Sequence, residues 1–324
     1  MKLTLIHPCI GRIPGKDYIR SWQMEPLPPA YLAALTPDDV EIAFHDDRME
    51  PIPFDEPTDL VAISIETYTA KRCYQIATEY RRRGVPVVMG GFHATLVPDE
   101  VSRFADAIVI GEAEQTFPQL IRDFRAGCMR PVYRQIQRLP LGYLRPDRNI
   151  FADKRYLKLG LVEASRGCQF RCNFCAIQAA YAGTHRHRPI DLLLEELDSM
   201  RSSRKLFFFV DDNIVSSPDF AKTFYRELAS LKIRWVSQAS ITLTYDDELL
   251  ALMRDSGCQG VLIGFESLNP DNLAAMNKRF NYARGGFEAA LAKLHQYGIR
   301  LYSTFVFGYD HDTLDDFKHT VDFC

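Results

Sequence analysis

Long apolar segments and a strong net charge are both missing from this sequence. No apolar stretch approaches the ~18 residues of a membrane-spanning helix, and the first apolar run ends at His7-Pro8, too soon for a signal peptide. The net charge is −3 over 324 residues, so no chain-wide basic field favours nucleic acid. We therefore expect neither a membrane span nor a nucleic-acid partner.

A disulfide framework is missing as well. The eight cysteines are spread over a long chain, and three of them stand together in one short stretch. This pattern fits metal binding in a reducing compartment better than secretion, which predicts a cytoplasmic location.

The clustered cysteines are Cys168, Cys172 and Cys175, at C-x3-C-x2-C spacing behind the apolar run Leu159–Ala164 and the turn-like Ser165–Gly167. Three thiolates can hold three irons of a four-iron, four-sulfur cluster, which usually takes four cysteines. No fourth cysteine lies nearby in the sequence, so one iron would stay open to a small molecule. Zinc prefers four ligands, usually as two paired half-sites, and no second pair follows.

Residues 1–127 alternate short apolar runs with helical stretches, which predicts an α/β domain built on a parallel sheet. The expected strands are Lys2–Ile6, Val40–His45, Leu60–Ile65, Val85–Met89 and Ala107–Ile110. The expected helices are Pro29–Leu35, Ala70–Arg83, Asp99–Phe104 and Glu114–Arg125. Nearly continuous apolar runs are typical of buried parallel strands, and a ligand of such a sheet binds at the carboxyl ends of the strands.

Residues 128–158 contain prolines and a glycine that predict an ordered linker, with one short strand around Val132. Residues 159–324 alternate strands and helices again, which predicts a partial (β/α) barrel with its active groups at the carboxyl ends of the strands. The expected strands are Leu159–Ala164, Leu206–Val210, Arg234–Ser237, Gly260–Phe265 and Leu301–Phe307. The expected helices are Ile190–Met200, Pro218–Leu231, Asp246–Asp255 and Gly285–Tyr297.

The cysteine motif, with the aromatic Phe174 directly before its last cysteine, resembles that of the radical S-adenosylmethionine (SAM) enzymes. The resemblance implies that the open iron binds SAM and that an electron from the cluster releases a 5′-deoxyadenosyl radical. It also implies a barrel of six strand–helix units. Five of these strands are visible here, so we expect the chain to be truncated at its C-terminus.

The same resemblance implies SAM contacts at the strand ends of residues 159–324. The candidates are Phe174, Asp211, Asp212, Asn213, Gln238, Glu266 and Ser267. Phe174 would bring the loop backbone to the adenine, and Glu266 would accept from the ribose hydroxyls. Gln238 is expected directly after the third strand. Arg188 is expected to face either a SAM carboxylate or solvent, and Cys258 is expected to be structural, in a turn before the fourth strand.

The strand ends of residues 1–127 resemble those of the Rossmann-like cobalamin-binding domain that precedes many radical SAM cores. The candidate cobalamin contacts are Ser64, Glu66, Thr67, Tyr68, Gly90, Gly91, His93, Gly111 and Glu112. The Asp-x-His-x-x-Gly motif of mutase-type domains is absent around His45–Glu50, which implies cobalamin without a histidine below the cobalt. His93 is expected to hydrogen-bond near the corrin. The competing hypothesis is a domain that keeps the fold and has lost the ligand.

The resemblance implies an enzyme that cleaves SAM reductively and transfers a methyl group from methylcobalamin to an unactivated carbon. An external donor such as flavodoxin or ferredoxin would supply the electron, and the substrate, a small molecule or a peptide, is not identified by the sequence. One alternative is radical cyclisation or rearrangement. Another is methylthio transfer, with a second cluster on Cys9, Cys73 and Cys128. The non-enzyme alternative is a corrinoid or cluster sensor or carrier.

Overall fold

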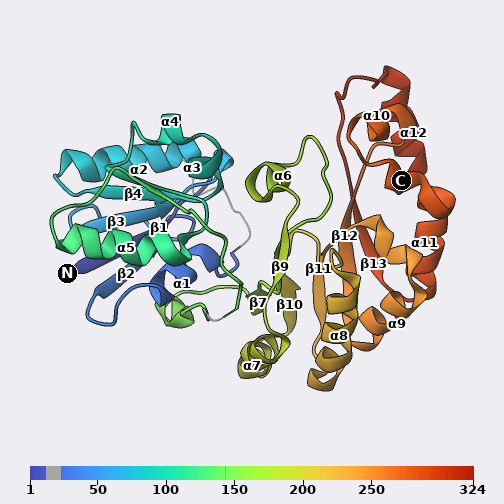
Figure 1. Cartoon of the computed structure of the whole chain (residues 1–324), viewed down its shortest axis with the longest axis horizontal. Coiled ribbons are helices and arrows are strands. Elements are labelled where there is room, and N and C mark those ends of the chain that lie inside the picture. Colours follow the sequence, from blue (N-terminus) through green and yellow to red (C-terminus); the bar gives the residue numbers. More distant parts are fainter. Residues whose placement is uncertain (12–22, 143) are drawn as a thin grey trace. The chain divides into compact units, whose positions relative to one another are not determined.

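The computed structural model describes residues 1–11, 23–142 and 144–324, and the chain divides into two compact units. The first unit comprises Met1–Leu139 and Leu144–Leu157, and the second comprises Pro140–Tyr143 and Lys158–Cys324. Each unit has its own sheets and its own hydrophobic core (Figure 1).

In the described part of the first unit, six parallel strands form one sheet in the order β2-β1-β3-β4-β5-β6. These strands are β1 (Lys2–His7), β2 (Glu41–Asp46), β3 (Leu60–Ser64), β4 (Val87–Gly90), β5 (Ala107–Ile110) and β6 (Val132–Arg134). The chain proceeds to one side from β1 and to the other side from β3. The carboxyl ends of β1 and β3 therefore flank the point where the strand order reverses, which is where ligands of such sheets bind.

Helices cover both faces of this sheet, which explains why its central strands are apolar along their whole length. The helices of the first unit are α1 (Leu27–Ala34), α2 (Ala70–Arg82), α3 (Phe92–Leu96), α4 (Pro98–Val101) and α5 (Ala113–Arg125), with 3₁₀ helices η1 (Thr67–Thr69) and η2 (Arg148–Phe151). One core contains side chains of α2, α3 and α4, and a second core contains side chains of α1 and α5, so the two helix sets lie on opposite faces (Figure 1).

Among the described residues of the second unit, five parallel strands form a sheet in the order β13-β12-β11-β10-β7. They are β7 (Leu159–Val162), β10 (Leu206–Phe209), β11 (Trp235–Ala239), β12 (Cys258–Glu266) and β13 (Arg300–Phe305). Two short antiparallel strands, β8 (Ser165–Gly167) and β9 (His185–His187), form a separate hairpin.

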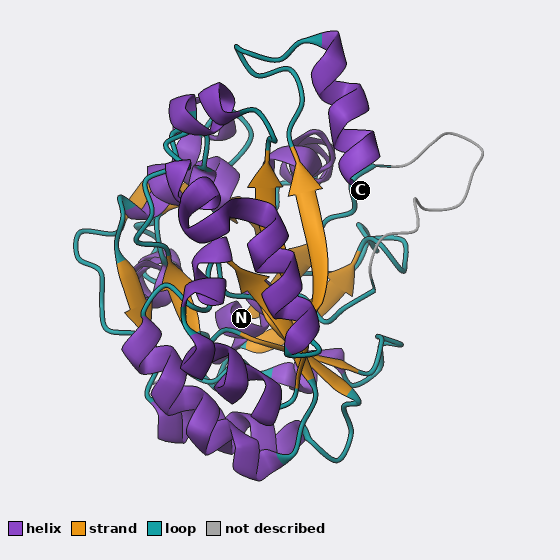
Figure 2. Cartoon of the chain, turned by 90° about the vertical axis from the view of Figure 1, so that its right-hand side faces the viewer, coloured by secondary structure: helices purple, strands orange, loops and turns teal. Residues whose placement is uncertain are grey.

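The helices of the second unit, except α6, which buries no side chain, pack on the sheet through amphipathic faces (Figure 2). They are α6 (Ala176–Tyr181), α7 (Ile190–Met200), α8 (Pro218–Leu228), α9 (Asp247–Asp255), α10 (Pro270–Ala275), α11 (Gly286–Gln296) and α12 (Leu314–Phe323), with 3₁₀ helices η3 (Ala229–Leu231), η4 (Ile241–Tyr245) and η5 (Arg279–Gly285).

Burial alternates along the strands of the second unit, because successive side chains point to opposite faces of a sheet. In β10 and β11, Phe209 and Ser237 are register partners and are buried on the helix side. Phe208 and Val236 are also register partners, and they are half-buried on the opposite face. Leu262 of β12 is the register partner of Gln238 and lies on this same face, so the face turned away from the helices carries partly exposed apolar side chains.

The predicted strands of both units form, and three local predictions were wrong. Ser165–Gly167 is not a turn but strand β8, which pairs with β9. Gln238 lies inside β11 rather than after it, and Cys258 is the buried first residue of β12 rather than part of a turn. The sequence shows the apolar centre of a strand, but pairing with a neighbouring strand decides where the strand ends.

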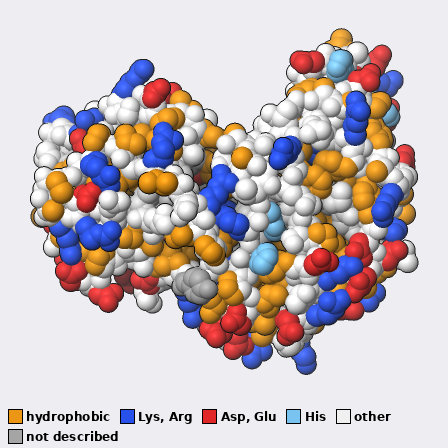
Figure 3. Space-filling model, in the orientation of Figure 1, with side chains coloured by type: hydrophobic (Ala, Val, Ile, Leu, Met, Phe, Trp, Pro, Cys, Tyr) orange, Lys and Arg blue, Asp and Glu red, His pale blue; other side chains and the backbone are white. Residues whose placement is uncertain are grey.

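No helix among the described residues combines the length and the apolar character needed to cross a membrane. On the face of the molecule drawn in Figure 3, basic and acidic side chains are interspersed, in agreement with the small net charge.

Candidate functional site

The cysteine loop begins and ends at the hairpin β8–β9. Gly167 pairs with His185, so the residues between them leave the hairpin and return to it. The loop is held from two sides. The Gln169 amide donates to Oγ of Ser216 (3.0 Å), after β10, and the Asn173 amide donates to the carbonyl of Met276 (3.3 Å), after α10. These contacts place the loop at the carboxyl ends of the barrel strands, as predicted.

The cysteines of this loop, Cys168, Cys172 and Cys175, are free and half-buried. Burial raises the pKa of the Cys172 thiol to about 11, Lys278 opposes this shift, and the charges of Cys175 and Cys168 add to it. Three thiolates that repel one another are a donor set that a cationic iron site neutralises. The residues therefore fit a cluster. Among the described residues no three metal-binding side chains converge, so the cysteines must turn inward to bind one.

The polar segment after β10 supports the cysteine loop with all three of its side chains. Asp211 is buried and accepts hydrogen bonds from the Ala164 amide (3.0 Å) and the Ser165 hydroxyl. Asp212 accepts from the Gly167 amide (2.7 Å).

Asn213 completes this support, because its amide nitrogen lies 3.6 Å from Sγ of Cys168 and its Oδ1 accepts from the Ser240 amide (3.1 Å). The segment was predicted to contact SAM. In the structure the fully buried Asp211 faces β8 instead, and Asp212 and Asn213 also bind the chain itself.

The environment of Asp211 makes stability depend on pH. Burial raises the pKa of Asp211 from 3.8 to about 7, so the folded state binds this proton more tightly than the unfolded state. Stability must then fall as the pH rises from about 4 to 7 and level off above that. We expect Asp211→Asn, which resembles the protonated acid, to remove this contribution.

The measurement is urea denaturation of both proteins between pH 4 and 8. The free energy of unfolding of wild type, relative to Asp211→Asn, should fall by up to about 1.4 kcal/mol per pH unit within that window. A difference that does not change with pH would contradict the assignment. Other titrating groups are common to both proteins and cancel.

Glu266, the predicted ribose contact, is the last residue of β12 and is fixed by a lysine. Nζ of Lys278 lies 2.8 Å from Oε1 of Glu266 and donates to the Gly264 carbonyl (2.9 Å). Glu266 has φ +65°, a conformation that L side chains rarely adopt. Its carboxylate folds back over Gly264, where a Cβ would lie 2.0 Å from Oε1. Glu266 is thus held at the strand end with one oxygen in an ion pair.

This contact makes Gly264 a sensitive position. We expect Gly264→Ala to push the Glu266 carboxylate away, leave the buried Lys278 unpaired and destabilise the protein by about 1–3 kcal/mol. In a Glu266→Ala background the same substitution should cost almost nothing, because the clashing carboxylate is gone. Urea denaturation of the four proteins of this cycle measures the coupling. Equal costs in both backgrounds would show that the Glu266 side chain is not the cause.

The other predicted SAM residues differ in their exposure and in their contacts within the chain. Phe174 is 44% exposed between Cys172 and Cys175. Gln238 is half-buried on the face of β11 that is turned away from the helices. Ser267 is buried, and its hydroxyl accepts from the Asn269 amide (3.0 Å) at the start of α10, so it has a structural partner.

Arg188 is not a surface residue. It is buried, and its guanidinium pairs with Glu196 of α7 at 2.7 Å and donates to the Glu163 carbonyl (3.1 Å). The prediction of a solvent-exposed position was wrong, because residue spacing alone does not show that Glu196, in the second turn of α7, lies against Arg188. The SAM contact stays a prediction.

In the first unit, the predicted cobalamin residues Ser64, Glu66, Thr67, Tyr68, Gly90, Gly91, His93, Gly111 and Glu112 lie at the carboxyl ends of β3, β4 and β5. The ends of β3 and β4 meet. Nδ1 of His93 lies 3.1 Å from Oγ1 of Thr67, and Nε2 lies 3.1 Å from the hydroxyl of Tyr74. Both ring nitrogens of the buried His93 therefore already have partners within the unit.

The glycines at these strand ends are explained by the fold. Gly91 has φ +116°, and a Cβ there would lie 2.8 Å from the Ile65 carbonyl oxygen. A Cβ on Gly111 would lie 2.8 Å from Oε1 of Gln135, whose side chain also hydrogen-bonds Glu112 (2.8 Å). Close packing of the chain on itself accounts for these residues without a ligand.

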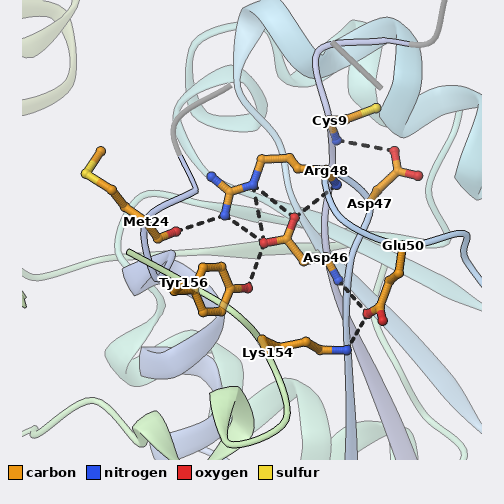
Figure 4. Close-up of polar contacts among 8 residues, drawn as sticks. All are labelled: Cys9, Met24, Asp46, Asp47, Arg48, Glu50, Lys154 and Tyr156. Carbon is orange, nitrogen blue, oxygen red and sulfur yellow. Dashed lines mark hydrogen bonds and ion pairs between the residues drawn. The ribbon is translucent and has the colours of Figure 1, made fainter. Parts of the chain in front are cut away.

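A polar network fixes the end of β2 (Figure 4). The fully buried Asp46 accepts from Arg48 (2.6 Å) and from the hydroxyl of Tyr156 (2.7 Å). Asp47 accepts from the Cys9 amide (3.2 Å) and forms a two-pronged ion pair with Arg72 (2.7 and 2.8 Å). Burial alone would raise the pKa of Asp46, but the hydrogen bonds and the charge of Arg48 bring it below the usual value. The carboxylates of Asp46 and Asp47 are therefore paired with arginines of the same unit.

The edge also offers groups that are open to a ligand. Nδ1 of His7, at the end of β1, is buried and has no hydrogen-bond partner among the described residues. Burial and the charge of Arg48 lower the pKa of His7 to about 4, so it is neutral at pH 7. Burial raises the pKa of Glu66 to about 7, and the ring of Tyr68 is 65% exposed. His7 ends β1, and Glu66 and Tyr68 follow β3, so all three lie at the strands that flank the switch point. A buried nitrogen without a partner, a carboxyl group with a raised pKa and an exposed aromatic ring fit a large planar ligand with amide groups.

Two functional residues escaped sequence reasoning. Lys278 stands in a stretch without a strand or a regular helix pattern, and Tyr156 lies in the predicted linker. Their partners Glu266 and Asp46 are 12 and 110 residues away in sequence, so no local pattern could have identified them.

Comparison with known proteins gives family matches for both units. Residues 162–324 match the model of the radical SAM superfamily, and residues 24–121 match that of the B12 binding domain. Bacteriochlorophyllide d C-12(1)-methyltransferase of Chlorobaculum tepidum is 33% identical over 309 residues, which are 92% of this chain and 68% of that protein. The C-8(2)-methyltransferase of the same organism is 28% identical, over 90% of this chain and 68% of that protein.

Among solved structures, the radical SAM methyltransferase TsrM from Kitasatospora setae, determined with cobalamin and a [4Fe-4S] cluster, has the same fold. The TM-score is 0.75 at 17% identity, and the match covers 99% of this chain and 72% of that chain.

Proposed function

Because the chain belongs to the radical SAM superfamily and carries a B12 binding domain, we propose that it is a cobalamin-dependent methyltransferase acting on an unactivated carbon. The observation that carries the proposal is that one chain has both sites. The second unit has three free cysteines at the carboxyl ends of its strands, and the first unit has a candidate ligand site where its strand order reverses. When bound, the cluster supplies the electron that cleaves SAM, and cobalamin supplies the methyl group.

We infer separate roles for the chain's own residues. Cys168, Cys172 and Cys175 hold the cluster, and the contacts of Gln169 and Asn213 keep their loop at the strand ends. Glu266, oriented by Lys278, accepts from the ribose hydroxyls of SAM. Its fixed position avoids the loss of side-chain freedom that ordering a mobile carboxylate would cost.

The names of the relatives make an alkyl carbon of a tetrapyrrole the first substrate to test. Phe208, Val236 and Leu262 are half-buried on the sheet face turned away from the helices, and this apolar face suits a large apolar ligand. We infer an external one-electron donor such as flavodoxin or ferredoxin. We also infer a cytoplasmic location, because free thiols at the cluster loop need a reducing compartment.

The test uses anaerobically reconstituted protein with hydroxocobalamin, a reductant and SAM carrying a deuterated methyl group. Bacteriochlorophyllide d is the first substrate offered. A product heavier by one labelled methyl in place of hydrogen, together with 5′-deoxyadenosine, supports the proposal. A product of unchanged or dehydrogenated mass indicates cyclisation or rearrangement. Absence of 5′-deoxyadenosine under all conditions indicates a sensor or carrier.

The arrangement of the remaining cysteines argues against methylthio transfer. Cys9 lies after β1, Cys73 is buried within α2, and Cys128 is exposed after α5. About four irons per chain would agree with methyl transfer, and about eight would favour the methylthio alternative.

A further inference from the structure

A hollow of about 490 Å³ lies at the amino ends of the parallel strands of the second unit. Its walls come from the segment before β10 (Arg201, Ser202, Arg204 and Lys205), from Phe207 of β10 and from residues 231–234, which precede β11. The cysteine loop lies at the carboxyl ends of the same strands. The hollow is therefore separate from the site described above, at the end of a barrel that ordinarily serves stability.

The lining of this hollow is strongly basic. Among the described residues no carboxylate lines it. Its five cationic side chains are Arg201, Arg204, Lys205, Lys232 and Arg234. The partly exposed Arg201 pairs with Asp198 at 2.6 Å, outside the lining. Apolar side chains complete the walls, including the buried Phe207 and Ile233. The hollow thus combines an apolar base with a rim of one sign of charge.

A hydrogen bond from a side chain to the backbone joins the two basic loops. The guanidinium of Arg234 donates to the carbonyl of Lys205 (3.3 Å), which joins the loop before β11 to the loop before β10. Lys232 has φ +51°, a left-handed conformation that costs an L residue about 1–2 kcal/mol and that glycine adopts freely. A lysine therefore stands at the rim of the hollow in a backbone conformation that favours glycine.

Cations that line one hollow repel one another, and no carboxylate in the lining offsets this repulsion. A bound anion removes that repulsion. Arginine and lysine are the side chains that proteins use for phosphate, arginine through its forked donors and lysine as a point charge. The volume lies in the ~300–1,000 Å³ range of small-molecule sites, which exceeds the needs of a single inorganic ion.

We propose that this hollow binds a small molecule carrying two or more phosphate groups. The cations of the two loops hold the phosphates, and the apolar base accepts the remainder of the ligand. The site is independent of the proposed methyl transfer, because it shares no residue with the cysteine loop or with Glu266.

The test is isothermal titration of the full reconstituted chain with pyrophosphate in about 150 mM NaCl, an ionic strength that screens weak surface attraction. We expect saturable binding at one site. Lys232→Gln and Arg234→Gln should each weaken it about tenfold or more, because each removes a charge-assisted contact. Lys318→Gln, an exposed lysine on α12, is the matched control and should change nothing.

Lys232→Gly separates loss of the charge from loss of the fold. It relieves the left-handed backbone, so the melting temperature should stay level or rise while pyrophosphate binding weakens. Titration with ADP shows whether the ligand is a nucleotide. Tighter binding of ADP than of pyrophosphate indicates a nucleotide, and equal binding indicates that the site recognises only the phosphate groups. Heat that does not saturate, or an equal loss in Lys318→Gln, would overturn the proposal. SAM cleavage should be unchanged in all three variants of the hollow, so this outcome does not depend on the proposed methyl transfer.

Discussion

Replacing Cys172 with alanine should abolish SAM cleavage and strip the chain of its iron. Cys172 is the middle member of the trio, and burial together with the charges of Cys175 and Cys168 raises its pKa. With two thiolates left, the cluster loses a third of its protein ligands, and no spare cysteine lies on the loop. We expect iron to fall from about four per chain to below one, and 5′-deoxyadenosine to fall below detection.

The matched control is Cys324→Ala, which removes an exposed cysteine of the same unit. Its iron content, its cluster absorbance and its rate of 5′-deoxyadenosine formation should equal those of the parent protein. Each protein is reconstituted anaerobically in parallel, and circular dichroism checks that the fold is kept. If Cys172→Ala held a full cluster and cleaved SAM, the assignment of the trio as cluster ligands would be wrong.

Glu196→Ala should strongly destabilise the second unit while leaving the cysteines intact. Glu196 and Arg188 are 2% and 4% exposed in their side chains and lie 2.7 Å apart. Removing one partner leaves an uncompensated buried charge, which typically costs about 3–5 kcal/mol. The paired replacement Arg188→Met with Glu196→Leu removes both charges and fills the space, so it should recover most of that loss.

Urea denaturation measures both effects. The paired replacement also tests whether Arg188 contacts SAM, since a folded double variant should cleave SAM at nearly the parent rate. A double variant that folds but binds SAM at least tenfold more weakly would confirm Arg188 as a ligand. Glu196→Ala that unfolds at the same urea concentration as the parent would show that the pair contributes little.

The sequence was sufficient for whatever depends on local chemistry. Apolar runs place β1 and β5 within a residue of their observed ends, because buried parallel strands are apolar throughout. The spacing of Cys168, Cys172 and Cys175 alone predicts a cluster with an open iron, since that prediction counts donors along the chain and needs no fold.

What the sequence could not predict depends on rotamers and on distant partners. Asp211 follows a strand and carries a charge, so it resembles a ligand contact, yet its side chain turns to the Ser165 hydroxyl in the adjacent hairpin. His93 resembles a corrin contact, yet Thr67 and Tyr74 already occupy both ring nitrogens. A strand end tells where a side chain starts but not which way it points.

The hairpin β8–β9 has a consequence for how the protein matures. By pinning the start and the finish of the cysteine loop to each other, it makes the loop a closed appendage of the barrel. Cluster binding then orders only this loop. Because the hairpin has already joined the ends of the loop, the entropy lost in closing it does not reduce the free energy of cluster binding. The barrel should accordingly assemble first, without iron, and remain a stable acceptor onto which the cluster is loaded later, unlike small zinc domains that fold only around their ion.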